Sequence, residues 1–449
     1  MTSSPVSVVP VEAPKEEPLE LSLLAEVEKN QPWICPASAK SIRTVNPIRA
    51  IVDPIVANMK TGEERGDGKD LISLALGDPT VAGNLPPCPV ALTAVETALQ
   101  SQGHAAGYVN ACGVPAAREA IARFHNAKSA DAVVIANGCS GALELALTAL
   151  LDPGTVLLVP SPGFPLYQVI AESHGASVVH YRLLPDQNWE CDLRHMEELL
   201  GLYGPHRVRG ILVNNPCNPT GAVFSRAHLE QLVAFAERHR LPIVADEVYG
   251  DLTFQEHPFH PMACVASGKV PVITASGLAK QFLVPGWRVG WIVFHDNVQG
   301  SLREVEAGAK RLAQVVLGAS HLVQMVVPKI LDSNNQELRQ WKADLKLTLE
   351  EQAKFLSLKL KDCPGLEVKE PQGAMYFILR IHVSKFGPAI QSDLDFSSLL
   401  LQEENVFVLP GIAFGVPGFF RVVFCGPATV LEQATKRIQC FCERHFQAS

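Results

Sequence analysis

The chain has 449 residues, and 38 Lys and Arg against 46 Asp and Glu give a formal net charge of −8. Hydrophobic residues make up 47% and charged residues 19% of the sequence, which excludes wholesale disorder because disordered chains combine low hydrophobicity with high charge. The acidic balance argues against a nucleic-acid partner, whose binding surface would be basic.

The N-terminal 40 residues are rich in Pro and Glu and show no hydrophobic period, so residues 1–40 are predicted to form a flexible arm. No basic region precedes an apolar stretch there, and no apolar run anywhere reaches the roughly 18 residues of a membrane span. The eleven cysteines are scattered and show no zinc-ligand spacing, which predicts reduced thiols and no metal site. We therefore expect a cytoplasmic protein without a membrane partner.

Short apolar runs follow, separated by longer amphipathic stretches. The runs are dense in Val, Ile and Leu, as is typical of strands buried on both faces of a parallel sheet. They lie at Ala132–Ala136, Val156–Val159, Ser177–Tyr181, Gly210–Val213, Pro242–Ala245, Val272–Ala275 and Val289–Phe294. The predicted class is α/β, with a mostly parallel seven-stranded sheet sandwiched by helices in a large domain over residues 86–335.

The pattern changes after Pro328, where strict alternation of strands and helices ends. A smaller α+β domain is predicted over residues 336–449, with residues 41–85 as an N-terminal segment that contributes to it. Its expected elements are a long helix over Glu337–Leu360 and strands at Ala374–Ile381, Phe419–Phe424 and Ile72–Leu76.

Polar loops follow several of the predicted strands, where an open α/β sheet binds its ligands. The first is Gly138, Cys139 and Ser140, which lead into a helix predicted over Ala142–Leu151. Small residues and a helix N-terminus, which Ser140 can cap, suit a phosphate. An ordinary capped helix start is the alternative.

Two further loops carry an amide, a carboxylate and a phenol. Asn218 lies in the turn NNPCNPTG, where two prolines fix the backbone and hold the amide in a defined direction. Asp246 ends a buried strand and needs a cationic partner, and Tyr249 follows three residues later. The alternatives are a rigid turn and a surface salt bridge.

The fourth loop contains Ser276 and Lys280 and is followed by Arg288. Apolar neighbours favour the neutral amine of Lys280, which could react with an aldehyde, and Arg288 could bind a phosphate. A lone lysine is more often a solvated side chain, but the four loops together match pyridoxal 5′-phosphate. Asp246 would then pair with the pyridinium nitrogen, while Asn218 and Tyr249 would hold the ring oxygen.

These motifs resemble the fold-type I pyridoxal-phosphate-dependent aminotransferases from about residue 40 to the C-terminus. The matching stretches are NPIRAIVDPI (46–55), SLALGDPTVAGNLP (73–86), NGCSGALELAL (137–147), VPSPGFPLY (159–167), NNPCNPTGAVFS (214–225), LPIVADEVYGD (241–251), SGLAKQFLVPGWRVGWI (276–292) and QGAMYF (372–377). The resemblance implies amino acid and 2-oxo acid substrates and a homodimer with shared active sites.

The resemblance also implies roles for residues on the cofactor side. Lys280 would hold the cofactor covalently and move the substrate Cα proton, and Phe164 would stack on the pyridine ring. Tyr108 would reach the phosphate of the neighbouring subunit. Many relatives carry a hydroxyl where this chain has Gly277, so the contact of Ser276 with the phosphate is an open expectation.

On the substrate side, the resemblance implies that Arg421 clamps the α-carboxylate, that Gly77 lines the pocket and that the segment around Asn46 covers it. The expected activity is ping-pong transamination of tyrosine and other aromatic amino acids with 2-oxoglutarate or pyruvate. The products would be 4-hydroxyphenylpyruvate and glutamate or alanine, with a broad substrate range.

The alternatives to this activity fall into two classes, other enzymes of the same fold and a DNA-binding regulator. An alanine aminotransferase-like enzyme, a carbon–sulfur lyase or an aminocyclopropane carboxylate synthase would share the cofactor residues, and only product analysis separates them. A DNA-binding regulator of the same fold would need a basic segment before the α/β domain, and the acidic arm does not provide one.

Overall fold

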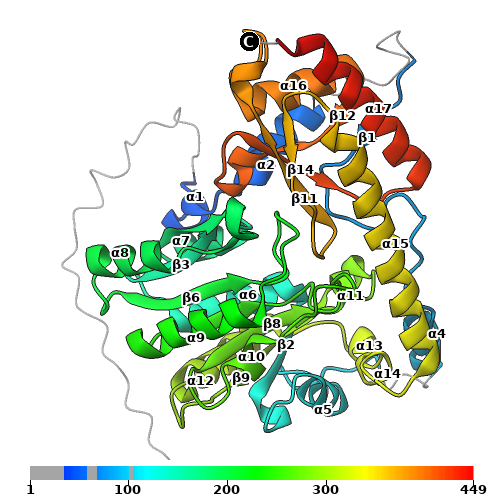
Figure 1. Ribbon diagram of the computed structural model, residues 1–449. Helices are drawn as coiled ribbons and strands as arrows, with labels where there is room; N and C mark the ends of the chain where they lie inside the picture. The colour runs from blue at the N-terminus through cyan, green and yellow to red at the C-terminus, as the bar shows by residue number, and fades with distance from the viewer. Residues whose placement is uncertain (1–34, 58–67, 101–104, 448–449) are drawn as a thin grey trace, which may run out of the picture.

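The computed structural model describes residues 35–57, 68–100 and 105–447 (Figure 1). Most of the predicted arm lies outside the described residues, which begin with helices α1 (Ala39–Arg43) and α2 (Pro47–Ala57). A large sheet with flanking helices lies beside a smaller group of elements that contains the long helix α15 (Gln336–Lys361).

The large sheet contains all seven predicted strands and one more, in the order β2-β9-β8-β7-β6-β3-β4-β5. Their bounds are β2 Val133–Asn137, β3 Val156–Ser161, β4 Ser177–Leu184, β5 Glu190–Cys191, β6 Val208–Asn214, β7 Ile243–Asp246, β8 Val272–Gly277 and β9 Val289–His295. The predicted count of seven was one short, because the two-residue β5 extends the edge beside β4. Strands β5 and β9 run opposite to the other six strands, which are parallel to one another, so the sheet is mostly parallel as expected.

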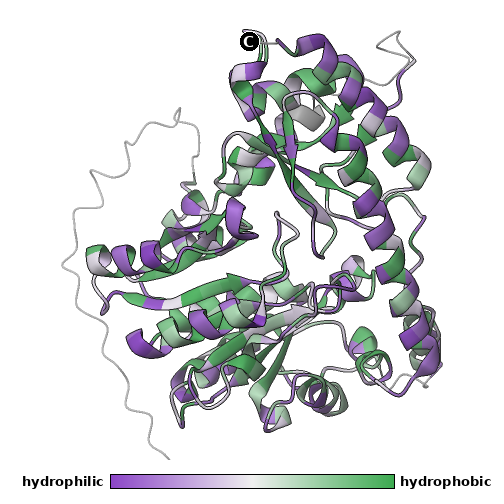
Figure 2. Ribbon diagram, viewed as in Figure 1, coloured by the Kyte–Doolittle hydropathy of each residue, from purple (hydrophilic) through white to green (hydrophobic). Residues whose placement is uncertain are grey.

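Both faces of this sheet are covered, which explains its continuous apolar strands. On β6, Ile211 and Val213 pack into one core with helices α8 (Leu193–Tyr203) and α9 (Arg226–His239), and the intervening Leu212 points to the opposite core. That opposite core contains α6 (Gly138–Leu150) and α12 (Arg303–Val316). Figure 2 shows the resulting hydrophobic strands between helices whose outer surfaces are hydrophilic.

The smaller group contains an antiparallel sheet in the order β10-β11-β14-β13 and a parallel pair β1-β12. The strands are β1 Ile72–Ser73, β10 Leu366–Val368, β11 Tyr376–Ile381, β12 Val406–Phe407, β13 Leu409–Pro410 and β14 Phe419–Val423. Helices α15, α16 (Asp393–Glu404) and α17 (Ala428–His445) pack together beside them. The pairing of β1 with β12 agrees with the predicted contribution of the early segment, while the domain boundaries remain predictions.

The other described helices are short. They are α4 Pro89–Leu99, α5 Pro115–Phe124, α7 Leu166–Ser173, α10 Met262–Val265, α11 Leu278–Gln281, α13 His321–Gln324 and α14 Val327–Ile330, with 3₁₀ turns at Ala130–Ala132, Pro185–Gln187, Pro285–Trp287, Val383–Lys385 and Gly411–Phe414. No helix in the described ranges is long and apolar enough to cross a membrane. All eleven cysteines lie within these ranges and are unpaired.

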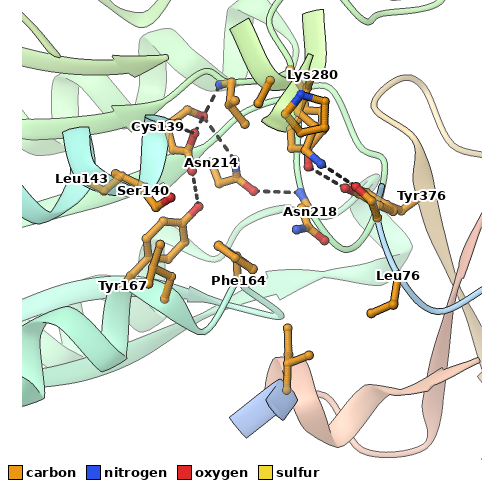
Figure 3. A pocket seen from close by; sticks show the side chains of 18 of the residues that line it. Leu76, Cys139, Ser140, Leu143, Phe164, Tyr167, Asn214, Asn218, Lys280 and Tyr376 are labelled. Atoms are coloured by element: carbon orange, nitrogen blue, oxygen red, sulfur yellow. Dashed lines mark hydrogen bonds between the residues drawn. The ribbon is translucent and has the colours of Figure 1, made fainter. Parts of the chain in front are cut away.

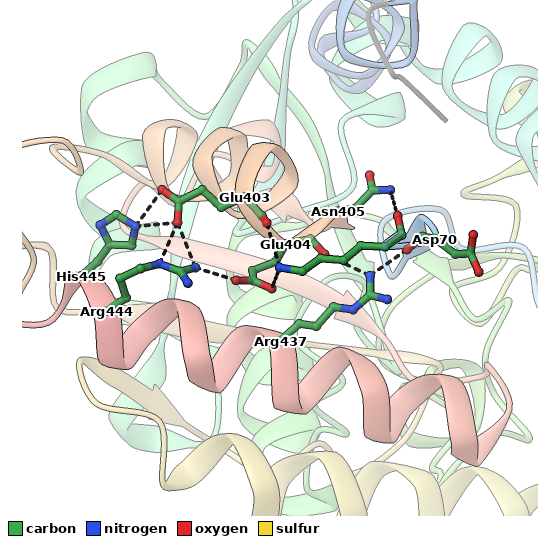
Figure 4. Close-up of polar contacts among 8 residues, drawn as sticks. Asp70, Glu403, Glu404, Asn405, Arg437, Arg444 and His445 are labelled. Atoms are coloured by element: carbon green, nitrogen blue, oxygen red, sulfur yellow. Dashed lines mark hydrogen bonds and ion pairs between the residues drawn. The ribbon is translucent and has the colours of Figure 1, made fainter. Parts of the chain in front are cut away.

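A polar network joins the start of β1 to the ends of α16 and α17 (Figure 4). The buried carboxylate of Glu404 lies 2.7 Å from Lys69 Nζ and 2.5 Å from Arg444 Nη2. Arg437 Nη1 donates to the backbone oxygen of Asp70 at 2.7 Å. Burial alone would raise the pKa of Glu404, but the hydrogen bonds from Arg444 and Lys69 outweigh it and leave the pKa lowered.

Candidate active site

A cavity of about 310 Å³ brings the predicted loops together with residues of the smaller group. Its walls include these ten residues predicted from sequence: Gly77, Cys139, Ser140, Phe164, Asn218, Asp246, Tyr249, Lys280, Arg288 and Arg421. Figure 3 shows side chains from strand ends of the large sheet and from the smaller group converging on this space. The strand ends thus meet at one cavity, as the carboxyl-end rule predicts, while its role as the active site remains a prediction.

One end of the cavity lies at the start of α6, where Gly138, Ser140 and Arg288 form what we call the α6 cradle. That helix begins at Gly138 rather than at the predicted Ala142, so Ser140 lies in its first turn and does not cap it. Arg288 Nη2 lies 3.2 Å from both Ser140 Oγ and the oxygen of Asn137. A Cβ on Gly138, whose φ is +73°, would lie 2.5 Å from that nitrogen. Glycine thus leaves room for the guanidinium beside the N-terminus of α6, and Arg288 together with the N–H groups of a helix's first turn suits a phosphate.

Asp246 is buried at the end of β7. It accepts hydrogen bonds from the Tyr167 hydroxyl at 2.7 Å, the Val248 backbone N–H at 3.2 Å and the more distant Cys139 thiol at 3.7 Å. Burial raises the pKa of Asp246, which these three donors only partly oppose. Among the described residues no cation pairs with it. The partner that the sequence predicts is thus not one of these side chains, and a cationic ring nitrogen in the cavity would supply it.

The neighbouring Glu247 points away from this cavity. Its Oε1 accepts from the Met262 backbone N–H at 2.7 Å, and burial raises its pKa to about 8. The Ser276 hydroxyl also points away from the cavity. It donates to the backbone oxygen of Glu247 at 3.4 Å and accepts from Gln281 Nε2 at 3.2 Å. Ser276 does not line the cavity, so the structure does not bring it together with the other predicted phosphate contacts.

Lys280 projects into the cavity from α11, directly after β8. Its Nζ donates to the Gly77 backbone oxygen at 2.5 Å, which links the large sheet to the segment after β1. A Cβ at residue 77 would lie 2.3 Å from the Tyr376 hydroxyl, so only glycine fits there. Within the described part of the chain, this half-buried amine is the one lysine among the cavity walls.

Arg421 occupies the other end of the cavity and is 4% exposed. Its Nη1 donates to Asn218 Oδ1 at 2.8 Å and its Nη2 to the Ala75 oxygen at 2.6 Å. The guanidinium lies between the rings of Tyr376 and Phe414, at 4.4 and 4.7 Å from their centroids. Burial lowers its pKa, its Nε has no partner, and no carboxylate in the described chain neutralises it. A buried guanidinium in this arrangement can bind a carboxylate that enters the cavity.

Hydrogen bonds hold the loops of the site to one another. Asn214 Oδ1 accepts from the Asn218 backbone N–H at 2.7 Å, and Asn214 Nδ2 donates to the Asp246 oxygen at 3.2 Å. The hydroxyls of Tyr249 and Tyr376 are 2.7 Å apart. The backbone at Asn218, which the prolines of its turn constrain, is thus also held by Asn214 at the end of β6.

Three predicted residues lie around the edge. Phe164 lines the cavity, with its ring edge-on to Tyr167 at 6.0 Å. Asn46 is exposed and accepts from the Ile48 backbone N–H at 3.1 Å, and Ile48 rather than Asn46 reaches the cavity. Tyr108 is 93% exposed and lies outside the cavity of its own chain.

Tyr167, Asn214 and Tyr376 line the cavity but were not predicted as site residues. Each lay inside a motif stretch quoted above, in VPSPGFPLY, NNPCNPTGAVFS and QGAMYF. Membership of these stretches was the signal by which they could have been found. Their hydrogen-bond partners gave no local signal, because Tyr167 lies 79 residues from Asp246 and Tyr376 lies 127 residues from Tyr249.

Residues 69–438 match the family described as aminotransferase class I and II, and the chain belongs to that family. The fold and the site thus define a transaminase. It is 40% identical to tyrosine aminotransferase of Mus musculus over 421 residues, which are 93% of this chain and 89% of that protein. The relative from Dictyostelium discoideum, also a tyrosine aminotransferase, is 40% identical over 92% of this chain and 97% of its own.

Solved structures agree with this assignment. The tyrosine aminotransferase of Leishmania infantum superposes with a TM-score of 0.85 at 31% identity, covering 93% of this chain and all of that one. The alanine aminotransferase of Pyrococcus furiosus gives a TM-score of 0.82 at 28% identity, covering 91% of this chain and all of that one. Both are aminotransferases, which is the activity that the sequence predicted.

Proposed function

We propose that this aminotransferase uses pyridoxal 5′-phosphate and exchanges amino groups between aromatic L-amino acids, tyrosine among them, and 2-oxo acids. The observation that carries the proposal is the buried guanidinium of Arg421, which faces the same cavity as Lys280 and Asp246 and has no carboxylate partner in the described chain. Amino acids and 2-oxo acids share the carboxylate that would fill this position.

The residues of the cavity fit the cofactor in charge and order. The α6 cradle with Ser140 and Arg288 would hold the phosphate, and Asp246 would hold a proton on the ring nitrogen. Tyr249 and Asn218 would bind the ring oxygen, and Phe164 would cover one ring face. The buried Asp246 supports this fit, because no cation among the described residues pairs with it.

The chain's own groups then divide the work. When bound, the cofactor supplies a carbonyl that takes up the amino group and a ring that withdraws electrons. Lys280 would bind that carbonyl, release it to the substrate and carry a proton to and from the substrate Cα. Arg421 would orient amino donor and oxo-acid acceptor alike through two parallel hydrogen bonds, which suits a ping-pong exchange at one site.

The walls near the substrate end support an apolar side chain. Ile48, Leu76 and Leu409 line this cavity, and its basic residues in the described chain are Lys280, Arg288 and Arg421. We assign Lys280 and Arg288 to the cofactor and Arg421 to the α-carboxylate of the substrate. A second carboxylate, on the substrate side chain, would therefore need a cation from outside these walls. The names of the relatives from mouse and Dictyostelium support tyrosine, while the Pyrococcus furiosus structure keeps alanine as the second candidate.

A matrix of amino donors against oxo-acid acceptors tests this proposal on the purified, cofactor-loaded protein. Tyrosine and phenylalanine should exceed alanine and aspartate in kcat/KM, with 4-hydroxyphenylpyruvate as the product from tyrosine. Lys280→Ala protein is the control for uncatalysed exchange. Alanine as the best donor without turnover of aromatic acids would contradict the substrate assignment, and release of ammonia or sulfide would indicate a lyase.

A homodimer with shared sites belongs to the same proposal. Tyr108 is 93% exposed, and Val315 and Val316 on α12 are 80% and 66% exposed beside a groove that Arg288 and Ser140 also line. A partner subunit seated there would cover these apolar side chains and bring its Tyr108 to the phosphate end. The unpaired cysteines support the proposal of a cytoplasmic location.

A further inference from the structure

Two neighbouring strands place a tyrosine beside the substrate arginine. On β11 and β14, Tyr376 pairs with Val423 and Ile378 pairs with Arg421. Tyr376 and Arg421 are therefore diagonal neighbours on one face of this antiparallel sheet, because side chains two residues apart on a strand share a face. The register brings the Tyr376 ring over the guanidinium, 4.4 Å from Cζ to the ring centroid.

The other end of the same side chain reaches the cofactor half of the cavity. The Tyr376 hydroxyl lies 2.7 Å from the Tyr249 hydroxyl, and the two rings meet edge to face with centroids 5.6 Å apart. It also lies against Gly77, whose oxygen accepts the hydrogen bond from Lys280. Tyr376 is 2% exposed (Figure 3). This single side chain thus contacts Arg421 through its ring and Tyr249 through its hydroxyl.

Either hydroxyl can be the donor in the hydrogen bond between Tyr376 and Tyr249. A phenol has one proton to donate, so Tyr249 can serve the ring oxygen of a cofactor only if Tyr376 is the donor in their mutual bond. Burial, with Tyr376 nearby, raises the pKa of Tyr249 well above its ordinary value and keeps it protonated. A bond received from Tyr376 would also polarise Tyr249 and strengthen its own donation.

We propose that Tyr376 is a positioning residue with two separable roles. Its hydroxyl donates to Tyr249 and directs the Tyr249 proton to the ring oxygen of the cofactor, whereas its ring holds the plane of Arg421 for the substrate carboxylate. Because these roles presuppose the cofactor proposed above, the test must separate the two claims.

Two substitutions divide the roles. Tyr376→Phe keeps the ring over Arg421 and removes the hydroxyl, and Tyr376→Leu removes both. Tyr181→Phe is the matched control, because Tyr181 is equally buried and its hydroxyl donates to the Leu212 oxygen at 2.8 Å away from the cavity walls. Thermal unfolding of each variant shows whether a change reflects folding alone.

The first readout is the pH midpoint of the cofactor's visible absorption in the loaded protein without substrate. Loss of the bond to Tyr249 weakens stabilisation of the deprotonated ring oxygen, so Tyr376→Phe should raise the midpoint by about 0.5 pH unit. Tyr376→Leu should raise it similarly, and Tyr181→Phe should leave it unchanged. An unchanged midpoint in Tyr376→Phe would refute the role of the hydroxyl, and a lowered one would show that Tyr376 competes for the Tyr249 proton.

The second readout is the Kd of 3-(4-hydroxyphenyl)propionate, a carboxylate without an amino group, measured from the same absorption. Tyr376→Phe should keep this Kd within about twofold, and Tyr376→Leu should weaken it about tenfold, as loss of a buried cation–π contact predicts. Equal weakening in both variants would refute the role of the ring. A wild-type protein without cofactor absorption would instead overturn the proposed function itself.

Discussion

Substitution of Arg421 by lysine keeps the positive charge but removes the planar pair of donors. The guanidinium is fixed by Asn218, by the Ala75 oxygen and by rings on both faces, so a substrate carboxylate meets two aligned N–H groups. Lysine offers one flexible ammonium in place of this fork. Losing one charge-assisted hydrogen bond of about 2 kcal/mol predicts a drop of about 30-fold in kcat/KM.

Initial rates with tyrosine, phenylalanine, 2-oxoglutarate and pyruvate measure this effect in both directions of the exchange. The loss should be the same for amino donors and oxo-acid acceptors, because all carry the carboxylate that Arg421 binds, and it should fall mainly on KM. Arg380→Lys is the matched control, since Arg380 lies on neighbouring β11, stacks on Phe419 at 5.3 Å and pairs with Glu367 at 3.4 Å outside the cavity. A loss restricted to one substrate class, or an equal loss in Arg380→Lys, would refute the shared clamp.

Three other predictions concern the cofactor end, the smaller group and the interface. In single-turnover assays, Asp246→Asn should lower the rate constant about 10²–10³-fold and Tyr167→Phe about tenfold. Equal small losses in the two variants would contradict a charged ring partner of Asp246. Glu404→Gln should lower the free energy of unfolding by about 1–2 kcal/mol at pH 7 in urea titrations. Its carboxylate stabilises the fold above its unfolded pKa, so the deficit should vanish as the pH falls through the lowered folded pKa, and a deficit that persists there would refute the ionic origin. Co-expressed Tyr108→Ala and Lys280→Ala subunits should regain activity if Tyr108 acts across the interface, and no regain would place it elsewhere.

The strands of the large sheet were predictable because each needs a run of Val, Ile and Leu to fill two cores. The alternation of Ile211, Leu212 and Val213 between those cores leaves a clear apolar signal. The edge strand β5 left none, since its pairing with β4 involves only Glu190 and Cys191. The early strand β1 is equally short, and its apolar neighbours identified it.

Among the site residues, position after a strand was the useful signal. Asp246 ends β7, and Asn218 and Lys280 closely follow β6 and β8, so their meeting at one sheet edge could be inferred from sequence. Arg421 lies inside β14, and only the resemblance pointed to it, because its direction depends on the register with β11.

Side-chain direction accounts for what the sequence left undetermined. Ser276 and Gly277 are adjacent in β8, and the hydroxyl of Ser276 turns to Glu247 and Gln281 rather than to the cavity. Tyr376 on β11 reaches Tyr249 in the turn after β7, a contact between distant parts of the sequence that no local pattern encodes. Hydrogen bonds of this kind depend on tertiary packing and become visible only in the structure.

Borohydride reduction of the loaded protein, followed by peptide mapping, shows whether Lys280 is the lysine that holds the cofactor. We expect one cofactor label, on the peptide that contains Lys280, because among the described residues this is the lysine that lines the cavity, together with Arg421, Ser140 and Arg288. Lys280→Ala protein should take up no stable label. A label on any other lysine, or none on the wild-type protein, would contradict the proposed active site.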